Sequence, residues 1–234
     1  AARGLQVIIA GAGGAAHLAA HAIPVRPRIK GAIVAVLGRR GFGIGYSLLS
    51  TGLLIWVIVA AGRAPFVSLW APAPWQAALA VGLMLIASLL AAYALAGVNP
   101  LSFGSRAAPF DPLHPGIAGV TRHPVLWALA LWGVAHLTAN GDLAHLILFG
   151  VMTAFALLGM ALIDRRKRRE WGRAAWQEQA HATAVLPLWA LLSGRWRPRT
   201  LPRLVPGLAA LLVWAGLIAL HPVVIGVDPL ALWP

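Results

Sequence analysis

The stretch WQAALAVGLMLIASLLAAYALAG, residues 75–97, contains no charged residue. A helix needs about 20 apolar residues to cross the hydrocarbon core of a bilayer, so this stretch is long enough to span it. Five further stretches have a similar character, at 5–23, 42–62, 125–140, 142–163 and 204–221. The sequence therefore predicts an all-α, polytopic membrane helix bundle with about six transmembrane helices, forming a single domain over residues 1–234.

The composition also indicates a membrane protein. Of the 234 residues, 60% are hydrophobic and 11% are charged, whereas soluble domains average roughly 45–50% and about 25%. An ordinary water-soluble enzyme is therefore excluded, and the lack of any Cys excludes a disulfide-stapled secreted module. A signal peptide is the rival interpretation of the stretch at 5–23. We expect a retained helix there, because no basic region and clean cleavage site precede a soluble domain.

The Lys and Arg residues lie mainly between alternate apolar stretches. Nineteen Lys and Arg against six Asp and Glu give a net charge of +13. If both termini lie outside, 17 of these basic residues fall on the cytoplasmic side and 2 fall outside. Cytoplasmic loops carry an excess of Lys and Arg, so the sequence predicts an N-out, C-out, multi-pass protein of the bacterial inner membrane. This orientation in the lipid bilayer then explains the positive net charge, and no nucleic acid is expected as a partner.

Histidine is the main candidate ligand in this sequence. The chain has eight His but no Cys, no paired carboxylates within an apolar stretch and no Gly-x-Ser-x-Gly motif. Polar groups inside a bilayer are costly and are functional candidates. His17 and His21 share one helix face, His136 lies inside the apolar run 125–137, and His221 ends the last apolar stretch. The alternative is a structural role, in which a ring caps a helix end or bonds to a backbone carbonyl.

A second candidate is the polar sequence Thr121-Arg122-His123-Pro124. Proline is common in the first turn of a helix, which places Arg122 and His123 at a helix N-terminus on the inner side. Backbone N–H groups and a guanidinium favour anions there, so we predict that these two residues bind an anionic group of a cofactor. His136 lies thirteen residues further on, about 20 Å along a straight helix and about 220° around it, and so belongs to a different site.

Taken together, these motifs resemble the NnrU family of bacterial membrane proteins over most of the chain. The most specific part runs from Thr121-Arg122-His123-Pro124 through LWGVAHL at 131–137 to NGDL at 140–143. Other matching stretches are LGRRGF at 37–42, YSL at 46–48, LWAP at 69–72, NP at 99–100, DRR at 164–166 and LHP at 220–222. The resemblance implies a role in denitrification and nitric oxide metabolism.

The NnrU family in turn resembles plant 15-cis-zeta-carotene isomerase, a membrane protein whose b-type haem is bound by His. This resemblance implies haem b, with His17 and His136 as metal ligands and His21 as a rival to His17. Gly133 stands where the isomerase has a Cys. His17 is expected about 10 Å from the inner face and His136 about 20 Å from it, whereas two axial nitrogens on one iron are only about 4 Å apart. His221 matches the depth of His136 better and is the substitute ligand.

Two other functions stay open. The Arg122-His123-Pro124 sequence is similar to a motif near the S-adenosylmethionine site of the isoprenylcysteine carboxyl methyltransferases, which implies methylation of a membrane substrate. The Tyr-rich Glu-Glu pattern of that group is missing here. The Ala- and Gly-rich stretch at 5–23 permits close helix contacts, as in a non-catalytic accessory subunit of a membrane complex. Whether the protein is an enzyme is therefore open, and haem-dependent isomerisation or redox chemistry is the first hypothesis.

Overall fold

A computed structural model describes residues 27–231, and this part of the chain consists of helices and loops with one isolated bridge. Four helices contain segments long and apolar enough to cross a membrane, which confirms the predicted all-α membrane class in this coarser form. They are α2 (Pro27–Gly62), α3 (Pro74–Ala96), α6 (Leu143–Trp171) and α9 (Leu204–Val224). The stretch at 5–23 lies outside the described residues. The count of six spans and the orientation stay predictions.

Four shorter helices complete the described chain. They are α4 (Ile117–Val120), α5 (Pro124–Asn140), α7 (Arg173–Ala180) and α8 (Trp189–Leu192). Helix α5 covers the fourth predicted span, and its 17 residues give a length of about 25 Å. Helix α6 continues beyond the predicted end at residue 163 and carries basic side chains in its last turns.

The chain folds as two compact units. The first unit is described over residues 27–71 and 140–151. Helix α2 bends at Gly38, whose φ of 70° is easily adopted only by glycine. The chain turns tightly before α6, with Gly141 at φ 66°. Asp142 caps α6, because its Oδ1 accepts the backbone N–H groups of Ala144 and His145 at 3.0 and 3.1 Å.

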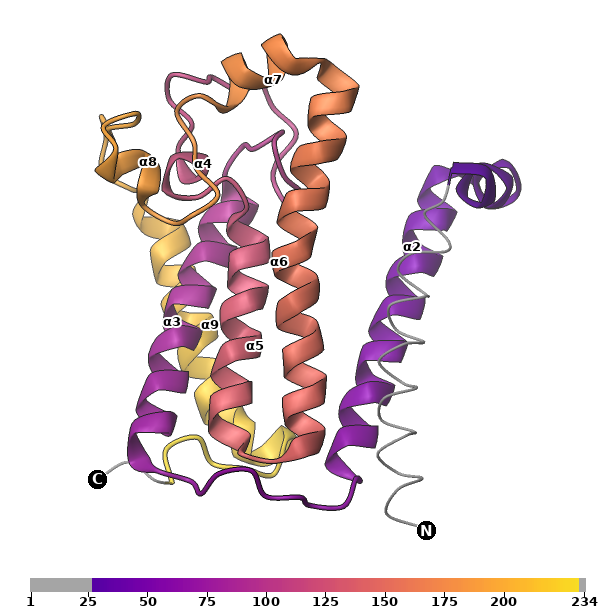
Figure 1. The fold of residues 1–234 in the computed structure, drawn as a ribbon, viewed down its shortest axis with the longest axis vertical. Helices are drawn as coiled ribbons and strands as arrows, with labels where there is room; N and C mark the ends of the chain where they lie inside the picture. The colour runs from indigo at the N-terminus through magenta and orange to yellow at the C-terminus, as the bar shows by residue number, and fades with distance from the viewer. Residues whose placement is uncertain (1–26, 232–234) are drawn as a thin grey trace. The chain divides into compact units, whose positions relative to one another are not determined.

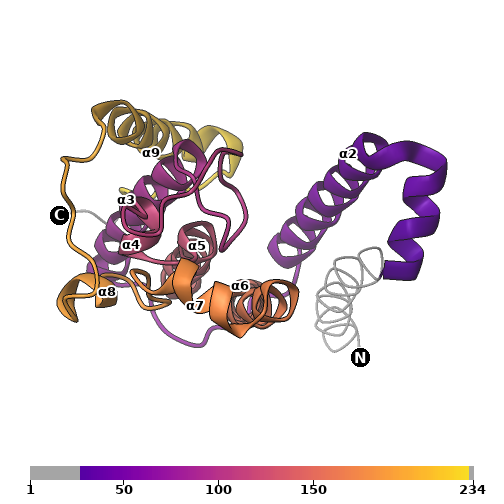
Figure 2. The ribbon, with the colours of Figure 1, turned by 90° about the horizontal axis from the view of Figure 1, so that it is seen from above.

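The second unit is described over residues 72–139 and 152–231 and is a helix bundle. Helices α3, α5 and α9 and residues 152–171 of α6 run side by side, with α4, α7 and α8 covering one end (Figures 1 and 2). We call this end of the second unit the capped end. Small and medium apolar residues fill the contacts between helices. They are Leu126, Ala130, Ala156 and Met160 between α5 and α6, and Ala87, Leu90 and Ala128 between α3 and α5.

Helix α9 packs against α3 in this bundle. The indole Nε1 of Trp214 donates to the carbonyl of Val81 at 3.0 Å, and the Tyr93 hydroxyl donates to the carbonyl of Arg203 at 2.8 Å. The remaining surface of α9 is apolar and exposed, with Leu208, Leu212 and Leu217 each at least 49% accessible. Exposed leucines over a full helix face are typical of contact with lipid, since they would be costly in water.

Candidate functional site

The connection between α4 and α5 enters the bundle at the capped end. Arg122 is 6% exposed and His123 is fully buried. Two hydrogen bonds hold this connection under the segment that follows α7. The backbone N–H of Arg122 donates to the carbonyl of Ala184 at 2.7 Å, and the Thr121 hydroxyl donates to the carbonyl of Val185 at 2.8 Å. The motif that the sequence placed at a helix start therefore lies inside the fold.

Arg122 forms a buried ion pair with Asp164 of α6. Its Nη1 lies 2.5 Å from the Asp164 Oδ2, and both side chains are less than a tenth exposed. Its Nε donates to the Thr183 Oγ1 at 2.9 Å. Burial lowers the pKa of Arg122, and the charge and hydrogen bond of Asp164 oppose this shift. A buried charge without its partner is strongly destabilising, so this pair anchors the polar cluster of the capped end.

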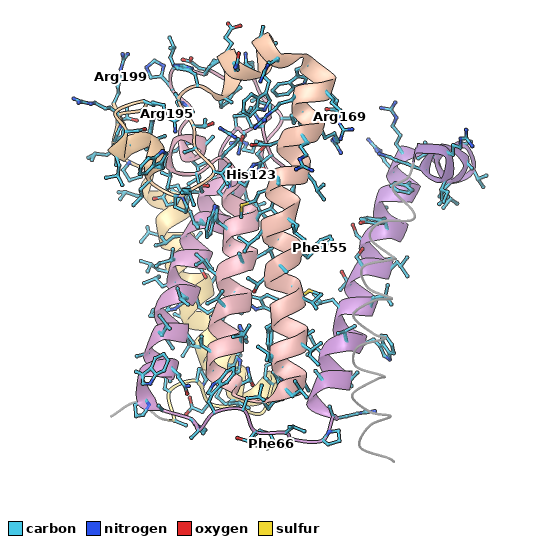
Figure 3. All side chains as sticks on the ribbon, in the orientation of Figure 1. Phe66, His123, Phe155, Arg169, Arg195 and Arg199 are labelled. Carbon is cyan, nitrogen blue, oxygen red and sulfur yellow. The ribbon has the colours of Figure 1, made fainter. Side chains whose placement is uncertain are left out.

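His123 connects Asp164 to a serine in the loop after α3 (Figure 3 labels His123). The His123 Nε2 lies 3.2 Å from the Asp164 Oδ1, and its Nδ1 lies 3.0 Å from the Ser102 Oγ. Asp164 thus gives one carboxylate oxygen to Arg122 and the other to His123. One imidazole links a carboxylate to a hydroxyl from a third segment of the chain.

The loop that carries Ser102 is held by Asn99, which is 1% exposed. The Asn99 Nδ2 donates to the carbonyl of Arg122 at 2.9 Å, and its Oδ1 accepts the backbone N–H of Leu101 at 3.1 Å. The Ser105 hydroxyl donates to the Asn99 carbonyl at 3.0 Å. These bonds fix the loop against the start of α5, so the position of Ser102 is set by buried groups on both sides.

Trp176 of α7 covers the ion pair. The guanidinium carbon of Arg122 lies 4.9 Å from the ring centroid of Trp176, and that of Arg168 lies 4.2 Å from it. Each such contact contributes about 0.5–2 kcal/mol. The indole Nε1 is buried and has no hydrogen-bond partner within residues 27–231. Aromatic stacking of guanidinium groups therefore holds α7 over the cluster.

At the other end of α5, His136 lies close to His221 of α9. Their ring centroids are 6.4 Å apart and their planes differ by 34°. The His136 Nδ1 is 2.8 Å from the carbonyl of Trp132, and the His221 Nδ1 is 2.6 Å from the carbonyl of Val227. These carbonyl contacts are also those that the structural role predicts for a ring. A carbonyl partner requires a proton on Nδ1, which leaves the lone pair of each ring on Nε2.

The spacing of these two rings is close to that of two imidazoles that would share one metal ion. Two metal–nitrogen bonds of about 2 Å, with about 1 Å more from each nitrogen to its ring centre, place such centroids about 6 Å apart. His17 and His21, the other predicted ligands, lie outside the described residues. Within residues 27–231 no group of three or more His, Cys, Asp or Glu is arranged to hold a metal ion. A metal held at this place by the described residues would therefore have at most these two His as ligands.

The structure brings some predicted residues together and separates others. Arg122 and His123 share one cluster, but protein groups already occupy their polar atoms. Their predicted role in holding an anionic cofactor group stays a prediction. Sequence reasoning missed Ser102 and Asp164, although Asp164 begins one of the stretches that carried the resemblance. No local spacing connects them to His123, because they lie 21 and 41 positions away from it in the sequence.

The comparison with known families covers nearly the whole chain. A family model described as NnrU protein matches residues 9–229, which is nearly the whole chain and includes the capped end and the His136–His221 pair. Neither the curated proteins nor the solved structures give a significant match. The chain therefore belongs to the NnrU family.

Proposed function

We propose that this membrane protein binds one haem b between His136 and His221, and that it serves redox or isomerase chemistry in nitrogen-oxide metabolism. The observation that carries the proposal is the 6.4 Å separation of two imidazoles from different helices. His17 or His21 is the alternative partner of His136.

The protein's part in this site is to orient the two imidazoles. A ligating His usually donates its second N–H to a carbonyl or carboxylate, which fixes the ring and raises its basicity. The carbonyls of Trp132 and Val227 are placed for this role. Haem would supply one-electron chemistry there. His221 lies in the last turn of α9, beside Pro222, so its ring position depends on the end of that helix.

The test is an absorption spectrum of the full chain purified from haem-replete cells, before and after dithionite. We expect a Soret band with one haem per chain. The variants His136→Ala and His221→Ala should each reduce haem content at least tenfold, as expected for loss of a metal ligand or its support. His181→Ala is the matched control, because the exposed His181 also bonds a carbonyl, that of Glu178, through its Nδ1.

A colourless preparation would refute haem binding. Loss of haem in His136→Ala but not in His221→Ala would leave His136 as a ligand and assign its partner to His17 or His21. The haem content of His17→Ala and His21→Ala, measured in the same way, would then identify which of the two is the ligand.

The orientation is also a proposal: six spans, with both chain termini outside the bacterial inner membrane. Supporting it, exposed arginines gather at the capped end, among them Arg169, Arg195 and Arg199 (Figure 3). Positive charge marks the cytoplasmic side. Because the chain has no Cys, single cysteines report sidedness directly. Gln177→Cys should react only after the membrane is permeabilised, and Val227→Cys should react in intact spheroplasts. Equal labelling of both would refute this orientation.

The methyltransferase and accessory-subunit hypotheses have less support. His123 is fully buried and Arg122 nearly so, and no feature of the described residues favours S-adenosylmethionine as their ligand. Calorimetric titration with S-adenosylhomocysteine tests the first hypothesis, since heat of binding would revive it. Co-purification with a stoichiometric membrane partner would support the second.

A further inference from the structure

We propose that the capped end holds a second reactive site, in which Ser102 is a nucleophile, His123 its general base and Asp164 a positioning residue. The substrates would be carboxylic esters with an apolar acyl group. This site is independent of haem, since it lies at the opposite end of α5 from His136.

Hydrogen bonds link Ser102 to His123 and His123 to Asp164. A nucleophilic serine needs a base within hydrogen-bond reach and a third group that orients the base. The Ser102 Oγ is 3.0 Å from His123, and His123 is 3.2 Å from Asp164. Here Nδ1 faces the serine and Nε2 faces the carboxylate. The reverse order is usual, but neutral imidazole accepts at one nitrogen and donates at the other in either arrangement.

Exposure to solvent differs among the three hydrogen-bonded residues. Ser102 is partly exposed, whereas His123 is fully buried and Asp164 is 5% exposed. The serine therefore lies between the buried base and the surface from which a substrate would approach. Asn99 fixes the Ser102 loop, as described above, so the hydroxyl is positioned before substrate arrives. Such preorganisation is the main requirement for rapid attack.

The backbone that follows Ser102 has two N–H groups that could stabilise an oxyanion. The N–H groups of Phe103 and Gly104 have no hydrogen-bond partner within residues 27–231. Gly104 has φ 79°, so this segment turns sharply directly after the serine. Serine esterases commonly stabilise the oxyanion with the N–H of the residue after the nucleophile. The exposed side chain of Phe103, directly after Ser102, adds an apolar surface next to the serine, which suits an apolar acyl group.

The chemical step balances without a further cofactor. The Ser102 Oγ bonds to the acyl carbon as its proton moves to the His123 Nδ1. The bond from the acyl carbon to the ester oxygen then breaks, and His123 gives the proton to the leaving alcohol. Water hydrolyses the acyl-serine by the same two transfers. Arg122 shares the charge of Asp164, so we expect a smaller acceleration than a serine with an unshared Asp would have.

The test is covalent labelling of the full chain in detergent by an alkyl fluorophosphonate, with the adduct located by peptide mass spectrometry. We expect one adduct, on Ser102, in the folded protein and none after heat denaturation. Ser102→Ala should abolish labelling, and Ser193→Ala should leave it unchanged. Removing the base in His123→Gln should slow labelling about 100-fold or more, the usual contribution of general base catalysis.

The role of Asp164 needs a variant that does not leave a buried charge unpaired. We therefore combine Asp164→Asn with Arg122→Met. This paired variant should lower the maximal labelling rate constant and leave the probe concentration for half-maximal rate unchanged. An unmodified Ser102 in the folded wild-type protein, or adducts spread over several serines, would overturn the proposal. Because the readout is the mass of a peptide, the result does not depend on whether haem is bound.

Discussion

Breaking the buried pair of Arg122 and Asp164 should reveal a large coupling energy. The perturbations are Arg122→Met, Asp164→Asn and the two combined. Arg122→Met leaves the Asp164 carboxylate buried, with His123 and the more distant Arg168, 3.9 Å away, as its remaining partners. Asp164→Asn leaves the guanidinium buried without a counter-charge. The combined variant has no buried charge at this position.

The magnitude follows from the burial of both side chains. Removing one partner of a buried pair costs about 3–5 kcal/mol of unfolding free energy. The combined variant loses the hydrogen bond of Arg122 to Thr183 and that of the Asp164 carboxylate to His123 but leaves no buried charge unpaired, so we expect a cost of about 2 kcal/mol. The two single variants together therefore lose more unfolding free energy than the combined variant does. The difference, which is the coupling energy, should be about 4 kcal/mol or more.

The assay is reversible unfolding in mixed micelles by increasing SDS, followed by tryptophan fluorescence. The matched control is the exposed pair of Arg166 and Glu170, whose Nε and Oε1 are 2.9 Å apart one helical turn from each other. Arg166→Met and Glu170→Gln should couple by about 0.3–0.5 kcal/mol, because water screens an exposed pair. If the buried pair couples no more strongly than this control, the reasoning about the polar cluster is refuted.

Two further predictions concern packing and titration. In Gly119→Ala the new Cβ would lie 2.4 Å from the Trp196 ring, so we expect a loss of about 1–3 kcal/mol of stability. In Gly216→Ala no atom lies within 4 Å of the new Cβ, so the free energy of unfolding should stay the same or rise. Chemical denaturation measures both variants. The hydrogen bond to His114 holds the pKa of Asp111 below its usual range. The contact therefore stabilises the fold at pH values above the usual pKa of an Asp. This stabilisation is lost as the pH falls through the lowered pKa of Asp111. His114→Ala should return the pKa of Asp111 toward its usual value in a carboxyl NMR titration, and an unchanged value would contradict the assignment.

The helices and the family were predictable from the sequence because their signals are local. The uncharged residues 75–97 form a spanning-length helix, Pro124 begins α5, and Asn140-Gly141-Asp142 turns the chain into α6. Each of these features depends on residues within about one turn of one another or on the mean hydropathy of one stretch. The same local logic identified the Arg122-His123 motif, but it placed these side chains facing a ligand.

Only the tertiary structure decided which polar groups meet. The sequence contained no Gly-x-Ser-x-Gly motif, yet Ser102, His123 and Asp164 converge from a loop, a helix start and the middle of another helix. The distance between His136 and His221 likewise depends on how α5 and α9 pack. Hydropathy and turn propensity are properties of neighbours along the chain. Hydrogen bonds and ligand spacings between helices depend on packing, because a rotation of one helix about its axis moves every side chain on it to a different neighbour.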